Sequence, residues 1–370
     1  MSRARSRCLY ETYRESLPPL ADYTVGDLGQ GFTPLVRSRA IGPALGLHEL
    51  FFKLEHLNPT GSYKDRFAGL AVALAVQRGA TSCLATSSGN TGAALAAFGA
   101  AFGLTCNLFV GENAPPGKLT QMQAYGARVL RVRDFCIDPG ESARIAADLK
   151  ECARCLRIPL LISAYCICPE AMEGIKTIAY EIAADLGIPD ELFAPAGGGG
   201  LCLATMRGFD DLAGGRTGVR LAVVQPTLND TIATPLNEGH ATARSVMTTT
   251  SISGLAVGHD LDGTAIIQAY GPAGARGILV SDEDILAAQA ELARKEGILV
   301  EPAGAASVAG VIAAARTRQL RAGSRIVCLL TGNGFKDPAS FDRVAQDNAA
   351  ALIPRDEISK VLVDQRVQRP

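Results

Sequence analysis

The sequence predicts an α/β fold with mostly parallel, twisted sheets, and three observations support this prediction. Short apolar segments alternate with helical segments of about 10–15 residues from about Lys53 to about Leu330, which is the pattern of right-handed βαβ units. Hydrophobic residues make up 48% of the 370 residues and charged residues 20%, which is enough for a large packed core. Aromatic residues make up only 5%, so small residues, chiefly alanine, must pack the helices against the sheets.

The first half of the chain is expected to hold four strands and the helices that connect them. Apolar runs bounded by turn formers predict strands over 81–86, 105–110, 128–132 and 160–164. Helical spacing of apolar residues predicts helices over 91–102, 117–125 and 141–156.

The second half repeats this alternation. Strands are expected over 192–195, 220–224 and 325–330, with helices over 173–186 and from about 200 through 206. Ser281 is a good N-cap for a further helix that Gly297 should end, because three acidic residues follow Ser281 in the first turn. The stretch 226–272 has weak periodicity and is either a mobile, ligand-facing segment or an irregular surface connection.

Charge and composition exclude several classes of protein. The chain has 36 Lys+Arg and 37 Asp+Glu, a net charge of −1, so nothing favours nucleic acid or an anionic membrane as a partner. No segment reaches the roughly 18 consecutive apolar residues that a membrane span needs. The polar first 16 residues do not resemble a secretory signal. We therefore expect a cytoplasmic protein whose ten cysteines are reduced.

The spacing of cysteine and histidine predicts no metal site. Cys152 and Cys155 lie on an expected helix, and Cys166 and Cys168 are too close together for a zinc knuckle, so the role of these four stays open. The four histidines form no metal-binding motif. The chain also lacks a Gly-x-Ser-x-Gly motif, which disfavours a serine hydrolase.

A lysine at the expected start of a helix is the first candidate for chemistry. Turn formers in the segment 58–66 lead into a helix expected over 63–77, and Ser62 and Asp65 have the spacing of a capping box. Lys64 then lies in the first turn, where the helix dipole and burial both lower the pKa of its amine. A Schiff-base lysine requires such a neutral nucleophile. The alternative is an exposed lysine paired with a nearby acid.

Two glycine-containing turns after expected strands are candidates for anion binding. In the loop 87–92, Gly89 allows close backbone approach, Asn90 offers a donor and an acceptor, and free N–H groups can hold a carboxylate. A tight turn is the alternative. Four consecutive glycines, Gly197 to Gly200, are typical of a backbone cradle for phosphate, although they match neither the Walker loop nor the dinucleotide fingerprint. A flexible hinge is the alternative.

A hydroxyl is expected where the last strand ends. Thr331 opens the turn Thr-Gly-Asn-Gly that directly follows the strand expected over 325–330. Ligands of parallel α/β sheets collect at the carboxyl ends of the strands. Thr331 is therefore a candidate binding residue, and an ordinary turn is the alternative.

Together these segments resemble the pyridoxal-phosphate enzymes of the tryptophan-synthase-β fold (fold type II), and most closely the threonine synthases. The resemblance covers roughly Asp27 to Pro338. It rests on Gly-Phe-Thr-Pro-Leu at 31–35, the lysine segment 58–66 with Tyr63 where phenylalanine is usual, Ser-Gly-Asn-Thr at 88–91, the tetraglycine, Thr331 and Glu-Pro-Ala-Gly-Ala at 301–305.

The resemblance implies two three-layer αβα domains with pyridoxal 5′-phosphate between them. We expect a smaller domain over 53–163, a larger one formed by 1–52 and 164–346, and a tail over 347–370. The resemblance further implies a homodimer and an amino-acid substrate.

The resemblance also implies roles for individual residues. Lys64 would form a Schiff base with the cofactor and shuttle protons, and Asn90 would bind the 3′-oxygen of the cofactor. Thr331 would face the pyridine nitrogen, which makes the cofactor a milder electron sink suited to elimination and replacement at a side chain. The cofactor phosphate would be held by Gly197, Gly198, Gly199, Gly200 and Leu201. The substrate would be bound by Ser87, Ser88, Gly89 and Thr91.

Three departures from the threonine-synthase pattern bear on the substrate. Ala171 stands where an arginine that helps to hold the substrate phosphate is expected, Cys168 replaces asparagine, and Ile175 replaces glutamine. The tetraglycine loop looks more like that of threonine or serine dehydratases. Asn333 stands where histidine is usual. O-phosphohomoserine therefore does not follow as the substrate.

The leading hypothesis is a pyridoxal-phosphate lyase or synthase of the threonine-synthase group, which eliminates a leaving group from an amino acid and adds water or another nucleophile. The alternative is a serine or threonine dehydratase, or a β-replacement enzyme that uses O-phosphoserine or a similar substrate. A catalytically inactive binding protein of the same fold is a third hypothesis, which the intact set of candidate residues disfavours. The sequence leaves open whether elimination occurs at the β or the γ carbon.

Overall fold

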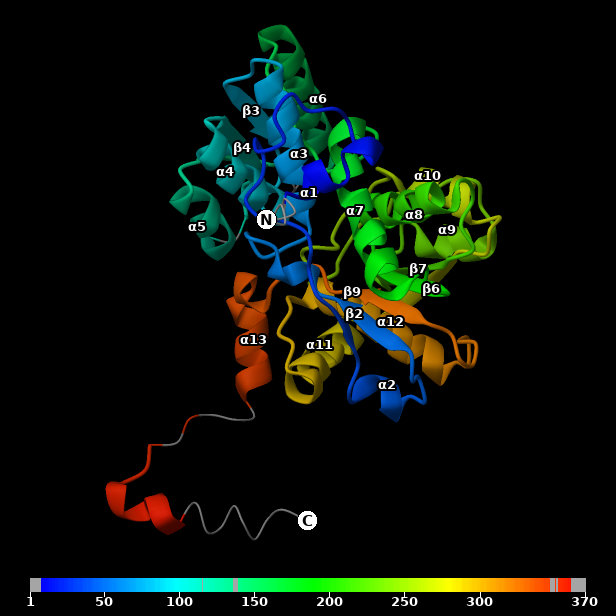
Figure 1. Ribbon diagram of the computed structural model, residues 1–370. Coiled ribbons are helices and arrows are strands. Elements are labelled where there is room, and N and C mark those ends of the chain that lie inside the picture. The colour runs from blue at the N-terminus through cyan, green and yellow to red at the C-terminus, as the bar shows by residue number, and fades with distance from the viewer. Residues whose placement is uncertain (1–7, 115, 136–138, 347–349, 351, 361–370) are drawn as a thin grey trace, which may run out of the picture.

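The computed structural model describes residues 8–114, 116–135, 139–346, 350 and 352–360, and two sheets organise it (Figure 1). The larger sheet has the strand order β1-β2-β9-β6-β7-β8 and is parallel except where β1 pairs with β2. The smaller sheet has the order β3-β4-β5 and is parallel throughout. The strands are β1 (Leu35–Arg37), β2 (Leu50–Lys53), β3 (Ser82–Ala85), β4 (Thr105–Gly111), β5 (Arg128–Val132), β6 (Glu191–Pro195), β7 (Arg220–Pro226), β8 (Arg276–Val280) and β9 (Ile326–Leu329).

Helices connect the strands and cover the sheets (Figure 1). The helix α11 continues as a π-helical turn over Leu292–Glu296. The helices are α1 (Leu9–Thr12), α2 (Ile41–Ala44), α3 (Lys64–Gln77), α4 (Asn90–Phe102), α5 (Pro116–Ala124), α6 (Pro139–Leu156), α7 (Pro169–Leu186), α8 (Gly200–Ala213), α9 (Ala233–Glu238), α10 (Gly263–Tyr270), α11 (Asp282–Glu291), α12 (Pro302–Arg316) and α13 (Pro338–Ala345).

Each face of the larger sheet packs on a different layer of helices. On β6, Leu192 and Ala194 join an apolar core that includes residues of α3, α4, α7 and α8, whereas Phe193 joins a second core with residues of α11 and α12. On β9, Val327 joins the first core and Cys328 joins the second. This alternation follows from the twofold side-chain period of a strand. The predicted α/β fold with helices on both faces of a mostly parallel sheet is therefore confirmed.

Most of the expected elements are present with shifted bounds. The largest shift is at α8, which ends at Ala213 rather than at 206, and α7 begins at Pro169 rather than at 173. The N-cap predicted at Ser281 is confirmed, since Ser281 Oγ accepts the N–H of Asp284 at 3.0 Å, and the Asp284 side chain completes a capping box. Gly297 ends the π-helical turn with a φ of +71°, which glycine adopts without strain. The stretch 226–272 holds two short helices, α9 and α10.

One expected strand is wrong. Over 160–164 the chain makes only an isolated parallel bridge, between Leu160 and Leu84 of β3. Pro159, which has no N–H to donate, precedes this bridge. The backbone then turns, because the N–H of Ala164 donates to the carbonyl of Ile162 at 2.8 Å. An apolar run therefore does not by itself distinguish a strand from a buried loop.

The smaller sheet lies within 53–163, whereas β2 ends at Lys53 and belongs to the larger sheet. The apolar core that contains α3 includes residues of both sheets. The domain boundaries stay a prediction. Within 347–370, the described residues include a short 3-10 turn at Arg355–Glu357.

Among the described helices, none is long and apolar enough to cross a membrane. The described residues contain no group of three or more His, Cys, Asp or Glu side chains that could hold a metal ion. The nine cysteines in this part of the chain are free thiols, and Cys152, Cys155 and Cys166 are exposed.

Candidate active site

The lysine segment is held against the segment that follows β9. Ser62 pairs with Gly332 in an isolated antiparallel bridge, and the N–H of Tyr63 donates to the carbonyl of Thr331 at 3.1 Å. Because α3 begins at Lys64, this lysine lies beside the carboxyl end of β9. The fold thus brings Lys64 and Thr331 together at the edge where ligands of parallel sheets collect.

The expected capping box at Ser62 is wrong. No side chain caps the first turn of α3. Asp65 instead accepts the N–H of Thr60 at 2.6 Å and also the Thr60 hydroxyl. The Ser62 hydroxyl is buried and has no hydrogen-bond partner in the described part of the chain. The reason is tertiary, because the bridge to Gly332 sets the backbone of Ser62.

The Lys64 amine lies in a polar cluster. Its Nζ donates to Ser163 Oγ at 2.7 Å, and Thr91 Oγ1 lies 3.0 Å from the same oxygen. Burial lowers the pKa of Lys64 to about 8, against the opposing effect of the Asp262 and Glu301 carboxylates. The lysine makes no ion pair with any described residue, so the alternative of a surface lysine paired with an acid is wrong.

The loop before α4 reaches the same cluster. Asn90 is the first residue of α4, and its Nδ2 donates to Glu301 Oε1 at 2.7 Å. Ser87 Oγ accepts the N–H of Gly89 at 3.2 Å, which shapes the turn. Neither Ser87 nor Ser88 hydrogen-bonds to the lysine in the described part of the chain. Thr91 and Asn90 therefore contact the cluster directly, whereas Ser87, Ser88 and Gly89 form the loop around it.

Glu301 lies beside Asn90 and links the segment before α12 to the segment after β9. Its N–H donates to the carbonyl of Gly332 at 2.9 Å, directly before α12. A Cβ at position 332 would lie 2.1 Å from Glu301 Oε1, so a larger residue there would displace the Glu301 side chain. Thr331, the preceding residue, is 4% exposed. The carboxylate of Glu301 thus lies within the polar cluster around Lys64.

The tetraglycine loop joins β6 to α8, and neighbouring side chains fill the positions that Cβ atoms would take. Gly199 has a φ of +92°, and a Cβ at Gly198 would lie 2.7 Å from the Leu261 side chain. A Cβ at Gly200 would lie 2.7 Å from Met172 Cε and 3.4 Å from the carbonyl oxygen of Ser163. The loop opens a helix of 14 residues, whose first N–H groups have no intrahelical partner. These features fit a backbone cradle for a phosphate group. Leu201 is buried in the apolar core.

Sequence reasoning did not single out Ser163 and Asp262, and it named Glu301 only within a family segment. Ser163 lies in the segment 160–164, which was wrongly expected to be a strand. The one sequence feature that could have marked it as a site residue is a polar side chain directly after an apolar run. Asp262 lies in a stretch without periodicity, so no local pattern marked it. Both residues reach the cluster through long-range packing.

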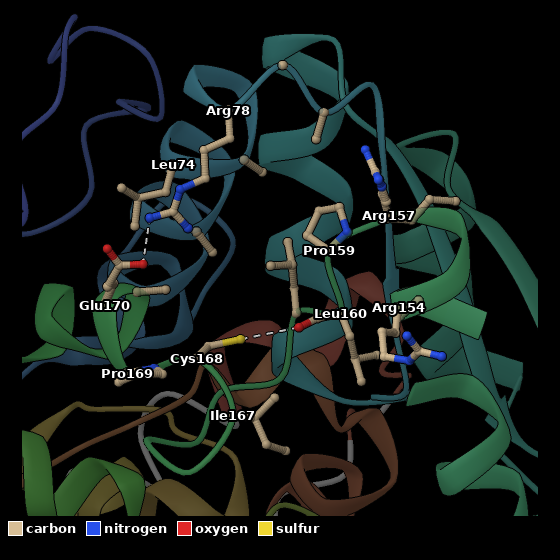
Figure 2. A pocket seen from close by; sticks show the side chains of 18 residues that line it. Leu74, Arg78, Arg154, Arg157, Pro159, Leu160, Ile167, Cys168, Pro169 and Glu170 are labelled. Carbon is tan, nitrogen blue, oxygen red and sulfur yellow. Dashed lines mark hydrogen bonds and ion pairs between the residues drawn. The ribbon is translucent and has the colours of Figure 1, made fainter. Parts of the chain in front are cut away.

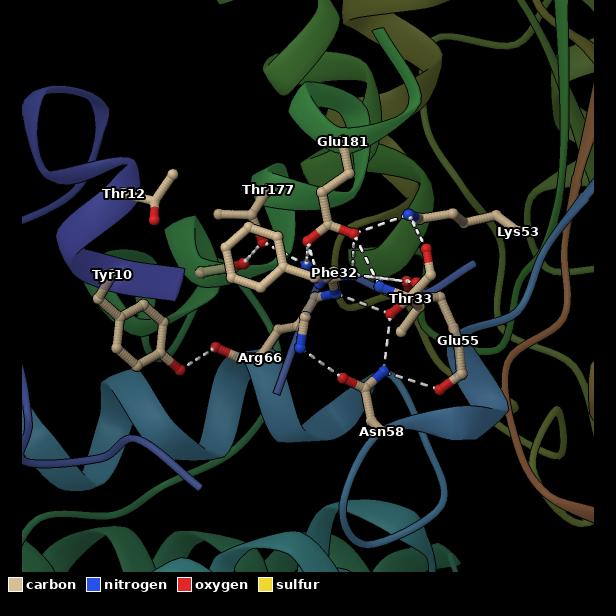
Figure 3. A network of polar contacts seen from close by, with 12 residues as sticks. Tyr10, Thr12, Phe32, Thr33, Lys53, Glu55, Asn58, Arg66, Thr177 and Glu181 are labelled. Carbon is tan, nitrogen blue, oxygen red and sulfur yellow. Dashed lines mark hydrogen bonds and ion pairs between the residues drawn. The ribbon is translucent and has the colours of Figure 1, made fainter. Parts of the chain in front are cut away.

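A buried ionic network anchors the helix that carries Lys64 (Figure 3). Arg66 bonds to Glu55 through Nε and Nη2, each at 2.7 Å, and to Glu181 through Nη1 at 2.6 Å and Nη2 at 2.8 Å. Lys53 adds a second cation, with its Nζ 2.7 Å from Glu181. Thr177 Oγ1 accepts a further bond from Arg66 at 2.9 Å. Two cations and two carboxylates from β2, α3, α7 and the turn after β2 thus neutralise each other in the buried interior.

Mutual pairing controls the ionisation of this network. Burial alone would lower the pKa of Arg66, but Glu181 and Glu55 outweigh it and raise that pKa. Burial alone would likewise raise the pKa of Glu181, yet Arg66 and Lys53 keep it well below the usual range. The network remains charged and fixes the first turn of α3, and with it the position of Lys64.

A cavity of about 530 Å³ lies beside α3 and the segment before α7 (Figure 2). Arg78 and Glu170 form an ion pair of 2.6 Å at its wall, and Cys168 Sγ donates to the carbonyl of Leu160 at 3.3 Å. Ala171 also lines this cavity, whereas Lys64 does not. The position where the resemblance predicts an arginine therefore borders a cavity other than the polar cluster of Lys64.

Comparison with known proteins agrees with this geometry. A family described as "Pyridoxal-phosphate dependent enzyme" matches residues 27–332. The chain belongs to this family. Its cofactor is pyridoxal 5′-phosphate, and the tetraglycine cradle and the partly desolvated Lys64 fit that group.

The relatives place the chain among threonine-synthase-like lyases. It is 34% identical over 367 residues to threonine synthase of Halalkalibacterium halodurans, covering 95% of each chain. It is 34% identical over 334 residues to threonine synthase of Mycobacterium tuberculosis, covering 88% of each. Among solved structures, threonine deaminase isoform 2 of Solanum lycopersicum has a TM-score of 0.74 at 20% identity, over 92% of this chain and 94% of that one. The predicted fold type II and the cofactor are confirmed.

Proposed function

We propose that this enzyme eliminates a leaving group from the side chain of an amino acid and adds water or another nucleophile in its place. The observation that carries the proposal is the state of Lys64. Its amine lies beside β9, donates to Ser163 Oγ at 2.7 Å, and has a pKa lowered to about 8. Such an amine exchanges protons near neutral pH, which an elimination and an addition both require.

The residues of the site divide into those that hold the cofactor and those that move protons. Lys64 would bind the cofactor covalently, the N–H groups of Gly197–Gly200 would hold its phosphate, and Asn90 its 3′-oxygen. Thr331 would face the ring nitrogen. When bound, pyridoxal phosphate supplies an electron sink for the carbanion that forms at the amino acid.

The protein then supplies proton transfer and orientation. Once the amino group of the substrate has replaced Lys64 on the cofactor, the free amine of Lys64 would accept the proton from the α-carbon and could return it after the leaving group departs, because its lowered pKa lies close to neutrality. Ser163 and Thr91 orient the amine through their hydroxyls. The loop 87–91 would hold the carboxylate of the substrate with its N–H groups.

Serine or threonine dehydration is the second candidate. It is favoured by the four uninterrupted glycines and by Ala171, which leaves no arginine at the position where the resemblance expects one. A homodimer is proposed from the resemblance, and a cytoplasmic location from the free thiols.

An absorption spectrum of the purified holoenzyme tests the proposal. We expect a visible band that is lost in Lys64→Ala, and a change of that band when the true substrate is added. Release of 2-oxo acid from serine or threonine would identify a dehydratase, and release of phosphate from O-phosphohomoserine a threonine synthase. A protein that gains no band with pyridoxal phosphate, or that releases neither product from any tested amino acid, would contradict the proposed function.

A further inference from the structure

The proposed reaction leaves one cavity of the molecule unused. It has a volume of about 530 Å³ and is lined by the end of α3, the end of α6 and the segments on either side of Ser163 (Figure 2). Arg78, the residue directly after α3, lines the cavity, whereas Lys64 begins that helix. A helix rises about 1.5 Å per residue, so these two residues lie about 21 Å apart along α3. The cavity is therefore separate from the polar cluster around Lys64.

The innermost part of this cavity is apolar. Leu74 and Ala75 of α3 line it and are each 5% exposed, and Leu161 lines it at 6%. These side chains carry no hydrogen-bonding group, so an apolar molecule placed against them gains burial without losing polar contacts. The volume lies within the range of roughly 300–1,000 Å³ that is usual for sites of small molecules.

Four charged side chains also line the cavity, and three of them are paired (Figure 2). Arg78 forms an ion pair with Glu170 at 2.6 Å, and Arg154 forms one with Glu151 at 2.5 Å. Arg157, the fourth, makes no side-chain hydrogen bond or ion pair with any residue that the structure describes. Among the described residues, the lining thus carries one positive charge that no carboxylate compensates.

The cavity contacts both ends of the loop 160–168, which carries Ser163. Leu160 and Cys168 line it, and Cys168 Sγ donates to the carbonyl of Leu160 at 3.3 Å, which closes the loop at its base. Within the loop, Ser163 Oγ accepts the bond from Lys64 Nζ at 2.7 Å. A molecule in the cavity would therefore contact the base of the loop that holds the hydroxyl partner of Lys64.

We infer that this cavity is a second ligand site, which binds a small organic anion with an apolar body and one negative charge. The apolar body packs on Leu74, Ala75 and Leu161, and the anionic group pairs with the guanidinium of Arg157. A neutral molecule of the same shape leaves this guanidinium unpaired. The inference goes beyond the proposed function, because none of the residues assigned to the cofactor or the substrate lines the cavity.

Calorimetric titration of the holoenzyme with hydrocinnamate tests the inference, because this probe combines a phenyl ring with one carboxylate. Hydrocinnamide is its neutral counterpart. Arg157→Gln removes the charge from the cavity, and Arg157→Lys retains it.

Arg318→Gln is the matched control. Arg318 is exposed and follows α12 much as Arg157 follows α6, with a φ of +56° against +53°. In both, the backbone N–H donates to the carbonyl three residues earlier. Arg318 does not line the cavity.

We expect the wild type to bind hydrocinnamate about fivefold more tightly than hydrocinnamide, the size of effect that an exposed ion pair provides. Arg157→Gln should abolish this preference, whereas Arg157→Lys and Arg318→Gln should retain it. Ala80→Leu, which narrows the cavity without changing its charge, should weaken both probes. No measurable binding, equal binding of the two probes by the wild type, or a preference that survives in Arg157→Gln would overturn the inference. The last result would place the probe elsewhere, for example at the substrate site.

Discussion

Lys64 and Arg66 lie two residues apart in the first turn of α3, yet the protein treats their positive charges in opposite ways. Arg66 bonds to both oxygens of two carboxylates, and these raise its pKa. Lys64 has a single hydroxyl partner, and burial lowers its pKa to about 8. Two residues of a helix differ by about 200° in direction, so the two side chains enter different environments.

The comparison shows how one helix turn can provide both stability and reactivity. The Arg66 network is saturated, which makes it rigid and chemically inert. The Lys64 cluster provides no ion-pair partner for the ammonium within the described residues. The neutral amine is therefore accessible near neutral pH and can react. The rigid Arg66 network holds the first turn of α3 in place, and with it the buried, weakly paired amine of Lys64.

The largest expected effect comes from breaking the Arg66 network. Arg66→Met should lower the free energy of unfolding by about 3–5 kcal/mol, because Glu55 and Glu181 would stay buried with only Lys53 as a cation. Denaturant unfolding of the purified variant measures the change.

Arg78→Met is the matched control, at the C-cap residue directly after the same helix. Arg78 pairs with Glu170 at 2.6 Å, but both side chains are more than half exposed, so its loss should cost less than about 1 kcal/mol. Equal losses in the two variants would contradict the distinction between a buried network and a surface pair.

The next effect concerns the ionisation of Lys64. In cofactor-free protein, acylation of this amine should reach half its maximal rate near pH 8, because burial disfavours the ammonium and releases its proton below the ordinary lysine value of 10.5. Peptide mass spectrometry after pulse labelling measures the profile. The same protein labelled in denaturant is the control and should follow the ordinary value. Identical profiles in the folded and unfolded protein would disprove the lowered pKa.

The smallest effect concerns the hydroxyl partner. Ser163→Ala should slow the reaction of Lys64 with pyridoxal phosphate by about two- to tenfold, because one hydrogen bond contributes a net 0.5–1.5 kcal/mol or so to orientation. The growth of the absorption band measures the rate. Ser163→Thr retains the hydroxyl and should react at close to the wild-type rate. An unchanged rate in the alanine variant would show that Ser163 does not position the amine.

Local patterns predicted the elements that local physics controls. The N-cap at Ser281 and the helix end at Gly297 depend on residues within one or two turns, and both are confirmed. The strand over 160–164 and the cap at Ser62 failed because distant partners decide them. Leu160 meets only one residue of β3, and Ser62 is drawn to Gly332 after β9.

The sequence by itself determined which chemical groups are present and where the local turns place them: a lysine at a helix start, four glycines between a strand and a helix, and Thr331 after the last strand. It also carried enough resemblance to name the fold and the cofactor. Only the tertiary structure decided what surrounds these groups. Ser163, Asp262 and Glu301 join Lys64 from positions about 100 to 240 residues away along the chain, and their effect depends on burial and distance, which no local pattern encodes.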